Sequence, residues 1–281
     1  MSPVPEGSPR PVKGLSWSGM THPGKMRPNN EDAFLALNFD AREVRHLGKI
    51  GAGSLGQSDY VFAVSDGMGG GHSGEFASRI ATRKITDLLP RSFSFASGHF
   101  DVGFGDVLTE LFSRIHGELI QMGQTYGECE GMGTTLSLGW FAPGRFCFGH
   151  IGDSRIYYLP HDGKMIQLTH DHTRAGVLRR RGEINERQER THPRRGILTQ
   201  VLGAGHQFLD PHLGALPYEP GDRFLFCTDG VNDGLWDHAL EDLLRLPVSP
   251  DSPISPAQRI VETAVLESGR DNTTALVVMI E

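Results

Sequence analysis

The chain has 281 residues, 38% of them hydrophobic and 22% charged, and its formal net charge is −7. This composition predicts a globular protein with a substantial core, in one large domain or two small ones. The negative charge argues against nucleic acid as the main partner, because a phosphate backbone demands a basic surface. A phosphorylated protein is not excluded, since a bound metal ion would reverse the local sign of the charge.

The N-terminal segment and the cysteines indicate the compartment. Residues 1–13 are rich in proline and serine, and they predict a flexible arm without the apolar core of a signal peptide. No apolar run reaches the roughly 18 residues that span a bilayer, so we expect no membrane partner and a cytoplasmic location. Cys147 and Cys227 lie inside apolar segments, which predicts buried free thiols in a reducing compartment.

Apolar and β-branched segments that stop at turn residues predict strands. Residues 59–67 form one such run, which ends at an Asp-Gly turn, and residues 223–230 repeat the same design. The turn Ala142-Pro143-Gly144 predicts a hairpin between the segments 133–141 and 145–153. A second turn, in HDGK, separates the predicted strands 155–160 and 165–169, and residues 273–280 close the chain as a buried strand.

Apolar residues at helical spacing predict helices between these strands, over residues 73–89, 106–123, 238–246 and 257–269. Gly269 is expected to end the last of them. Most strands are joined by short hairpins, and the helices enter between groups of strands rather than after each one. That order favours an α+β fold with antiparallel sheets covered by helices over a parallel βαβ sheet.

Acidic residues recur where these strands end. Asp66, Asp153 and Asp229 each follow an apolar run, while Asp32 and Asp271 stand in loops beside other strand-like segments. Any one of them can be an ordinary turn former, and singly that interpretation is favoured. Together, carboxylates brought to the rim of a sheet by separate strands provide the hard oxygen ligands that Mg²⁺ and Mn²⁺ prefer. The pattern therefore indicates a metal-dependent hydrolase.

Arg27 precedes Glu31 by four residues, and a guanidinium can hold two phosphate oxygens at once. The ordered set of motifs resembles the type 2C metal-dependent protein phosphatases (the PPM family) in their bacterial form, from about residue 15 to the C-terminus. The motifs are Arg27-x3-Glu31-Asp32-Ala33, Asp66-Gly67-Met68-Gly69-Gly70, Gly131-Met132-Gly133-Thr134-Thr135, Gly152-Asp153-Ser154-Arg155, Thr228-Asp229-Gly230 and Asp271-Asn272-x-Thr274.

The resemblance implies a fold and a ligand set. The fold would be a four-layer α-β-β-α sandwich of two antiparallel sheets flanked by helices. It would make residues 14–281 a phosphatase domain, with a flap at about 170–203 and an extended loop at about 40–59. Two Mn²⁺ or Mg²⁺ ions are implied, with a weaker third. Carried over by position, the ligands of the two ions would be Asp66 (bridging), the carbonyl of Gly67, Asp229 and Asp271, and Asp153 with Asp229 would bind the third ion. Glu31 and Asp32 would hold metal-bound waters, and Arg27 would bind the phosphate. Asp233 and Asn272 would support the ligands.

The implied activity is hydrolysis of phosphoserine and phosphothreonine on proteins, by in-line attack of a metal-bridging hydroxide. Arg27, Asp66 and Asp229 would be the catalytic residues. Expected partners are phosphorylated proteins, with a Ser/Thr kinase and its substrates among them, and we expect a monomer. The alternative is a catalytically silent scaffold of the same fold that binds phosphoproteins.

Three features depart from the family pattern or extend it. Met68 stands where some members carry a histidine that serves as the general acid, so either metal-bound water or His72 must protonate the leaving group. The arginine-rich flap predicts a solvated mobile helix pair or a grip for acidic protein surfaces, with Arg179, Arg180 and Arg181 as the test residues. Residues 40–59 contain IGAGSLGQ, which mimics a kinase glycine loop, and they predict a flexible β-hairpin extension.

Overall fold

The computed structural model describes residues 12–281 except 41, 57, 70–71, 99–102, 206–207 and 249–253, and it describes only the backbone of residues 89–98. The predicted N-terminal arm, residues 1–13, therefore lies almost wholly outside the described residues. Within the described part, no helix is long and apolar enough to cross a membrane.

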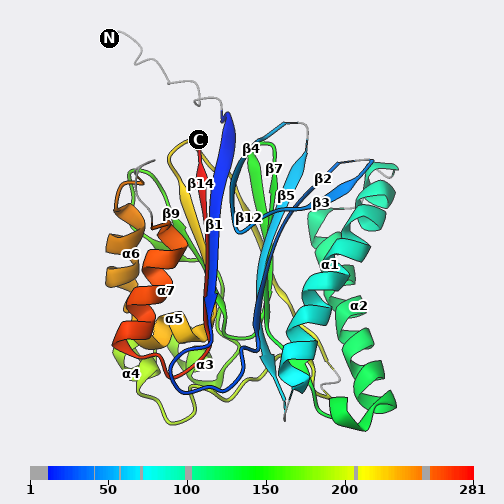
Figure 1. The fold of residues 1–281 in the computed structure, drawn as a ribbon, viewed down its shortest axis with the longest axis vertical. Helices are drawn as coiled ribbons and strands as arrows, with labels where there is room; N and C mark the ends of the chain where they lie inside the picture. The colour runs from blue at the N-terminus through cyan, green and yellow to red at the C-terminus, as the bar shows by residue number, and fades with distance from the viewer. Residues whose placement is uncertain are drawn as a thin grey trace.

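Two antiparallel sheets form the centre of the molecule (Figure 1). In the first sheet the strands follow the order β10 (Ile166–Gln167), β9 (Arg155–Leu159), β13 (Arg223–Cys227), β14 (Thr273–Ile280), β1 (Gly14–His22) and β4 (Ile50–Ser54). In the second the order is β11 (Leu202–Gly203), β6 (Gly133–Thr134), β5 (Asp59–Met68), β7 (Leu136–Ala142), β8 (Arg145–Ile151) and β12 (His212–Leu216). Strand β2 (Asp32–Phe39) pairs with β5 and carries β3 (Val44–His46) on its other edge.

Helices cover the outer face of each sheet, which gives the four-layer α-β-β-α sandwich that the family resemblance implied (Figure 1). The second sheet carries α1 (Ser73–Gly98) and α2 (Phe104–Thr125), followed by the short 3₁₀ turn Gly127–Cys129. The first sheet carries α5 (Asp229–Gly234), α6 (Asp237–Arg245) and α7 (Pro256–Glu267). The small helices α3 (Arg174–Arg180) and α4 (Glu186–Arg190) lie at one end of the sandwich, the lower end in Figure 1.

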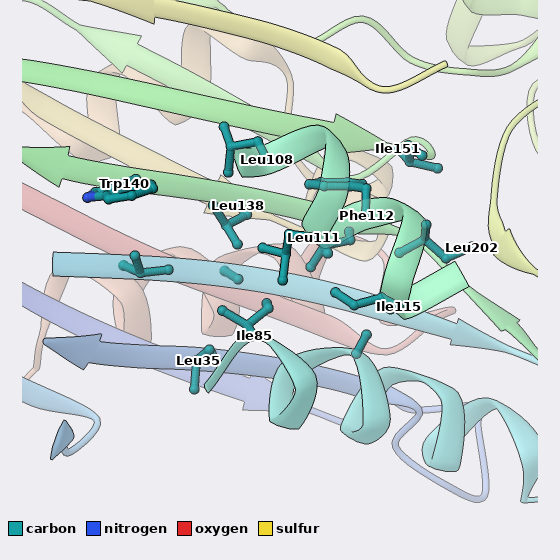
Figure 2. Packing of buried hydrophobic residues seen from close by; sticks show 14 of the residues in the cluster. Leu35, Ile85, Leu108, Leu111, Phe112, Ile115, Leu138, Trp140, Ile151 and Leu202 are labelled. Carbon is teal, nitrogen blue, oxygen red and sulfur yellow. The ribbon is translucent and has the colours of Figure 1, made fainter. Parts of the chain in front are cut away.

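Alternation along the strands divides the core into three apolar clusters. In β5, Phe62 and Val64 join the cluster between the sheets, whereas Val61 and Ala63 face the cluster under α1 and α2. Figure 2 shows part of the cluster under those helices, including Leu138 of β7. Because neighbouring side chains of a strand point to opposite faces, both faces of a covered strand must be apolar, which explains its unbroken hydrophobic run.

The middle layer is largely aromatic. Phe146 of β8 and Phe224 of β13 come from different sheets, and their ring centroids lie 4.5 Å apart. Gly139 lies beneath this cluster, where a Cβ atom would come within 2.5 Å of the ring of Phe226. Replacing one such fully buried phenylalanine by alanine would cost about 3–5 kcal/mol. Aromatic packing therefore fixes the position of one sheet relative to the other. This in turn fixes the ends of the strands, where the acids lie.

The loop at 40–59 differs from the prediction. Its two strands do not pair with each other as a hairpin, because β3 pairs with β2 in the second sheet and β4 pairs with β1 in the first. The glycines of IGAGSLG have a packing role. A Cβ atom at Gly51 would clash with the ring of Trp17, and one at Gly53 would clash with the hydroxyl of Tyr60. Trp17 Nε1 also donates to the carbonyl of Gly48, at 2.9 Å. The segment thus passes from one sheet to the other.

Candidate metal centre

The predicted acids meet at one end of the sandwich. Asp66 lies near the end of β5, and Asp153 follows β8 by two residues. Asp229 begins α5 directly after Thr228, and Asp271 precedes β14 by two residues. These four acids line one pocket of about 450 Å³, together with Arg27, Glu31, Gly67, Asp233 and Asn272. The structure therefore brings every predicted site residue except Asp32 to the wall of a single pocket.

Asp66 is fixed by its backbone. The hydroxyl of Thr135 accepts the N–H of Asp66 at 3.0 Å, and the hydroxyl of Thr134 donates to its carbonyl at 2.8 Å. A glycine is required at position 67 because the chain passes close to another segment there. A Cβ atom at this position would clash with the carbonyl oxygen of Gly74. The two threonines belong to the predicted Gly-Met-Gly-Thr-Thr motif, so their role is to hold the Asp-Gly segment in place.

Asp32 lies beneath the pocket rather than on its wall. Its Oδ2 accepts hydroxyl hydrogen bonds from Thr228 and Thr274, both at 2.7 Å, whereas its buried Oδ1 has no partner among the described residues. Asp32 also stands directly opposite Asp66 in the β2–β5 register. It therefore ties β2 to Thr228, which follows β13, and to Thr274 of β14, and it places a carboxylate next to Asp66 on the neighbouring strand.

Asn272 holds the loop that carries Arg27 and Glu31. Its Oδ1 accepts the N–H of Glu31 at 2.7 Å. Its Nδ2 donates to the carbonyls of Pro23 and Asn29, at 2.9 and 2.8 Å. One buried amide thus satisfies three backbone groups of residues 23–31, which fixes where the loop meets the pocket.

Arg27 reaches the same pocket from that loop. Its Nη2 donates to Oδ2 of Asp271 at 2.6 Å, and its side chain is 52% exposed. The hydrogen bond to Asp271 is the largest cause that raises the pKa of Arg27, so the guanidinium is firmly charged. An exposed cation at the mouth of an acidic pocket is suited to binding an incoming anion.

Burial and mutual repulsion make the carboxyl groups at the pocket difficult to ionise. Burial raises the pKa of Asp32 and of Asp153 to about 7. Burial, and after it the neighbouring carboxylates, raises the pKa of Asp66 and of Asp229 well above the usual range. The buried Oδ1 of Asp229 has no hydrogen-bond partner among the described residues. Carboxylates that repel one another and leave an oxygen unpaired fit a site for hard divalent cations.

The oxygen ligands in the pocket fit Mg²⁺ or Mn²⁺, which keep bound waters, better than a metal ion whose ligands all come from the protein. Among the described residues, no three Asp, Glu, His or Cys side chains converge closely enough to bind one ion together. Mg²⁺ commonly uses only one or two carboxylates and keeps several waters. The pocket offers such carboxylates and the backbone of Gly67, and it has room for solvent.

The flap closes one side of the pocket with residues that sequence reasoning did not select. Arg155 is buried, and it binds Asp171 through its Nε and Nη2 atoms at 2.9 and 2.7 Å. Its guanidinium also lies 3.6 Å from Glu189 of α4. The motif Gly152-Asp153-Ser154-Arg155 contains this arginine, but of its residues only Asp153 is a predicted site residue. Buried ion pairs of this kind join β9 to the flap.

The flap arginines do not form one solvated face. Arg179 pairs with the buried Glu189 at 2.5 Å, and Arg180 donates to the carbonyl of Asp171 at 2.8 Å. Arg195 binds Asp233 through two nitrogens, at 2.5 and 3.1 Å. The hypothesis of a gripping surface at residues 179–181 therefore loses Arg179, which is engaged within the protein.

No histidine is among the residues that line the pocket in the described part of the chain. Met68 does line it, as expected, and it has no proton to donate. The side chain of His72 is 70% exposed, and its Nδ1 lies 3.8 Å from a carboxylate oxygen of Glu75. Of the two predicted proton sources, His72 thus receives no support from the pocket geometry.

Comparison with known proteins agrees with this geometry. A family model described as protein phosphatase 2C matches residues 49–252. The serine/threonine protein phosphatase PstP of Mycobacterium tuberculosis is 32% identical over 247 residues, which cover 86% of this chain and 45% of PstP. This chain therefore spans less than half the length of PstP. The serine/threonine phosphatase stp of Listeria innocua is 29% identical over 242 residues, covering 85% of this chain and 92% of stp.

Solved structures give the same result. A crystal structure of PstP superposes with a TM-score of 0.74 and 29% identity, covering 95% of this chain and 99% of the PstP chain. The catalytic domain of PstP in complex with two manganese ions superposes with a TM-score of 0.70 and 28% identity, covering 95% and 98% of the two chains. With its four-layer fold and the family model matching most of its length, the chain belongs to the protein phosphatase 2C family.

Proposed function

We propose that this chain is a metal-dependent phosphatase that hydrolyses phosphoserine and phosphothreonine on proteins. The observation that carries the proposal is the pocket in which Asp66, Asp153, Asp229 and Asp271 meet beside the exposed cation of Arg27. A protein fold has little reason to gather four partly exposed carboxylates in one pocket unless a cation is to neutralise them.

In this proposal Asp66, the carbonyl of Gly67, Asp229 and Asp271 would hold two Mn²⁺ or Mg²⁺ ions. Asp153, with Asp229, offers a weaker third site. When bound, the ions would supply activation of water and neutralisation of the negative charge that develops on the phosphoryl group. Uncatalysed phosphate-monoester hydrolysis is slow enough to need accelerations of up to about 10²¹, and general acid–base groups contribute only about 10²–10⁴.

The residues of the chain position the substrate around those ions. Arg27 would exchange its carboxylate partner Asp271 for two oxygens of the phosphate, which its planar guanidinium matches. Asn272 keeps the loop of Arg27 and Glu31 in place during that exchange. Water attacks phosphorus as the bond to the serine or threonine oxygen breaks, and the leaving oxygen takes a proton. Because Met68 cannot supply that proton, solvent in the pocket is its source.

Hydrolysis of p-nitrophenyl phosphate and of a phosphothreonine peptide, with Mn²⁺ and with chelator, tests the proposal. Activity should require the metal, and Asp66→Asn or Asp229→Asn should lower kcat/KM by more than the roughly 10–100-fold that is typical for loss of a residue supporting a metal ligand. Asp242→Asn, an exposed change on α6, is the matched control and should retain activity. A scaffold would bind the phosphopeptide without releasing phosphate. Full activity in the Asp66 and Asp229 variants would refute the assigned ligands.

The finer expectations stay predictions of the sequence. They include a Ser/Thr kinase whose products this chain would reverse, a monomeric state and a cytoplasmic location. The acidic net charge of −7 is compatible with phosphoprotein substrates, since bound ions together with Arg27 would make the pocket itself attractive to phosphate.

A further inference from the structure

A second pocket of about 390 Å³ adjoins the candidate catalytic pocket. The two pockets share Arg190, Arg195 and Asp233 among their lining residues. Its other walls come from Trp236 before α6 and from the segment that follows α7, including Arg270. Because the pockets are neighbours, residues close to a phosphate bound in the first pocket are within reach of the second.

The second pocket is basic in a chain that is acidic overall. Three guanidinium groups and two carboxylates line it, while the chain carries a net charge of −7. Arg195 and Asp233 neutralise each other through their two-nitrogen contact. Arg270 is exposed and has no ion-pair partner among the described residues. The remaining acid is Glu267, which is exposed at the end of α7.

Arg190 and Trp236 form a prepared platform in this pocket. The guanidinium carbon of Arg190 lies 4.0 Å from the centroid of the Trp236 ring, and its Nη1 donates to the carbonyl of Leu235 at 2.6 Å. Glu186 approaches this guanidinium only to 4.0 Å. Trp236 is 39% exposed, an unusual fraction for a side chain of this size. Rigid aromatic and arginine side chains next to each other are typical anchors of binding sites.

We propose that this second pocket binds an anionic side chain of the substrate, a carboxylate or a second phosphate, a few residues away from the phosphorylated residue. The inference rests on the proposed phosphatase function, and it specifies the substrate class as acidic or multiply phosphorylated segments. Arg270 supplies the free cation, and the platform of Arg190 and Trp236 supplies a pre-organised wall. Pre-organisation matters because little side-chain freedom is lost when the anion binds.

Phosphothreonine peptides that differ at one position test the proposal. Each peptide carries glutamate, a non-hydrolysable phosphonate, alanine or lysine at a single position within four residues of the phosphothreonine. The quantity measured is the ratio of kcat/KM for the anionic peptide to that for the alanine peptide on the same enzyme. Loss of folded protein or of metal affinity cancels in this ratio. The glutamate and phosphonate arms show which anion the pocket prefers.

The wild-type ratio should reach about two- to fivefold at one or two positions, the range of an exposed charge pair. Arg270→Gln and Trp236→Leu should bring it toward one. Arg187→Gln is the matched control, since Arg187 is exposed on α4 and lines neither pocket. A wild-type ratio near one at every position, a preference for lysine, or an equal loss in the Arg187 variant would overturn the inference.

Failure of this inference is distinguishable from failure of the proposed function. Hydrolysis of p-nitrophenyl phosphate with Mn²⁺ reports on the catalytic pocket alone, because this substrate is too small to reach Arg270 as well. Activity on that substrate together with a ratio of one would refute the role of the second pocket and support the phosphatase function. Absence of activity on every substrate would refute both.

Discussion

Replacing Asp229 by asparagine should raise stability in chelator and abolish most of the stabilisation by Mn²⁺. Asp229 lies among other acids in the pocket, and its buried Oδ1 has no hydrogen-bond partner among the described residues. Without a cation, its negative charge is a cost to the folded state. With a cation, the same charge is a ligand. Asparagine keeps the size of the side chain and removes the charge.

The magnitude follows from these two roles. Repulsion between two unit charges about 4 Å apart is worth about 1–4 kcal/mol at the dielectric constants of water and of a protein surface, and asparagine removes this repulsion although it keeps an oxygen acceptor. The asparagine variant should therefore melt higher than wild type in chelator by roughly 2–16 °C, since 1 kcal/mol moves the Tm by about 2–4 °C in a domain of this size. Mn²⁺ at 100 times its Kd would stabilise the wild type by about 2.7 kcal/mol, or about 5–11 °C.

Thermal unfolding in chelator and in excess Mn²⁺ measures both effects without any catalytic assay. The matched control is Asp242→Asn, because Asp242 is an exposed acid on α6 outside the pocket. It should move neither Tm by more than about 1–2 °C. The reasoning is refuted if the Asp229 variant is less stable than wild type in chelator and still gains the full Mn²⁺ shift, because Asp229 would then be neither a strained charge nor a ligand.

Three further outcomes follow from the contacts around the pocket. Asn272→Ala should speed hydrogen exchange at the Glu31 amide and lower kcat/KM by about tenfold; unchanged exchange would contradict the role of Asn272 in holding that loop. Arg155→Met should lower the free energy of unfolding in urea by about 3–5 kcal/mol, since it strands buried carboxylates; a loss below about 1 kcal/mol would contradict this. His172→Gln should reduce the loss of stability between pH 7 and pH 5, measured in chelator, by about 2 kcal/mol relative to wild type.

The sign of the pH effect comes from the direction of the pKa shift. Burial, and after it the charge of Arg180, lowers the pKa of His172 to about 4, whereas an unfolded histidine titrates near 6.5. As the pH falls below 6.5 the unfolded chain binds the proton first, so the wild type loses stability down to about pH 4. Acids with raised pKa values act in the opposite direction, and comparing the two proteins removes their contribution. Equal pH slopes would contradict the buried neutral state of His172.

Most strands that the sequence predicted contain an apolar run, whereas strand β1, which it did not predict, is buried for a different reason. Strand β1 carries Gly14, Ser16, Ser18 and Gly19, yet most of the strand is buried. The hydroxyl of Ser18 accepts the N–H of Ala257 in α7, at 3.2 Å. Small residues are needed there because a helix lies close to the strand, and only the tertiary structure reveals this.

Helix ends were predicted less well than helix positions. The prediction ended the first helix at residue 89, before Pro90, whereas the backbone of α1 continues to Gly98. A proline removes only one hydrogen bond from a helix, and a helix supported by tertiary contacts can continue past it. The last helix ends as expected, because α7 stops at Glu267 and Gly269 has a φ of 63°.

The site itself was largely predictable because its chemistry is concentrated in short motifs, whereas the pairing that assembles it was not. Nothing in the string Thr228-Asp229-Gly230 or in Asp271-Asn272-x-Thr274 shows that their threonines meet on Asp32, which lies 196 and 242 residues away in the chain. That meeting follows from β13 and β14 being neighbours in one sheet while β2 lies in the other. The threonines of these motifs thus act on the site indirectly. They hold the buried carboxylate of Asp32 next to Asp66 and so join the ends of the two sheets at the pocket.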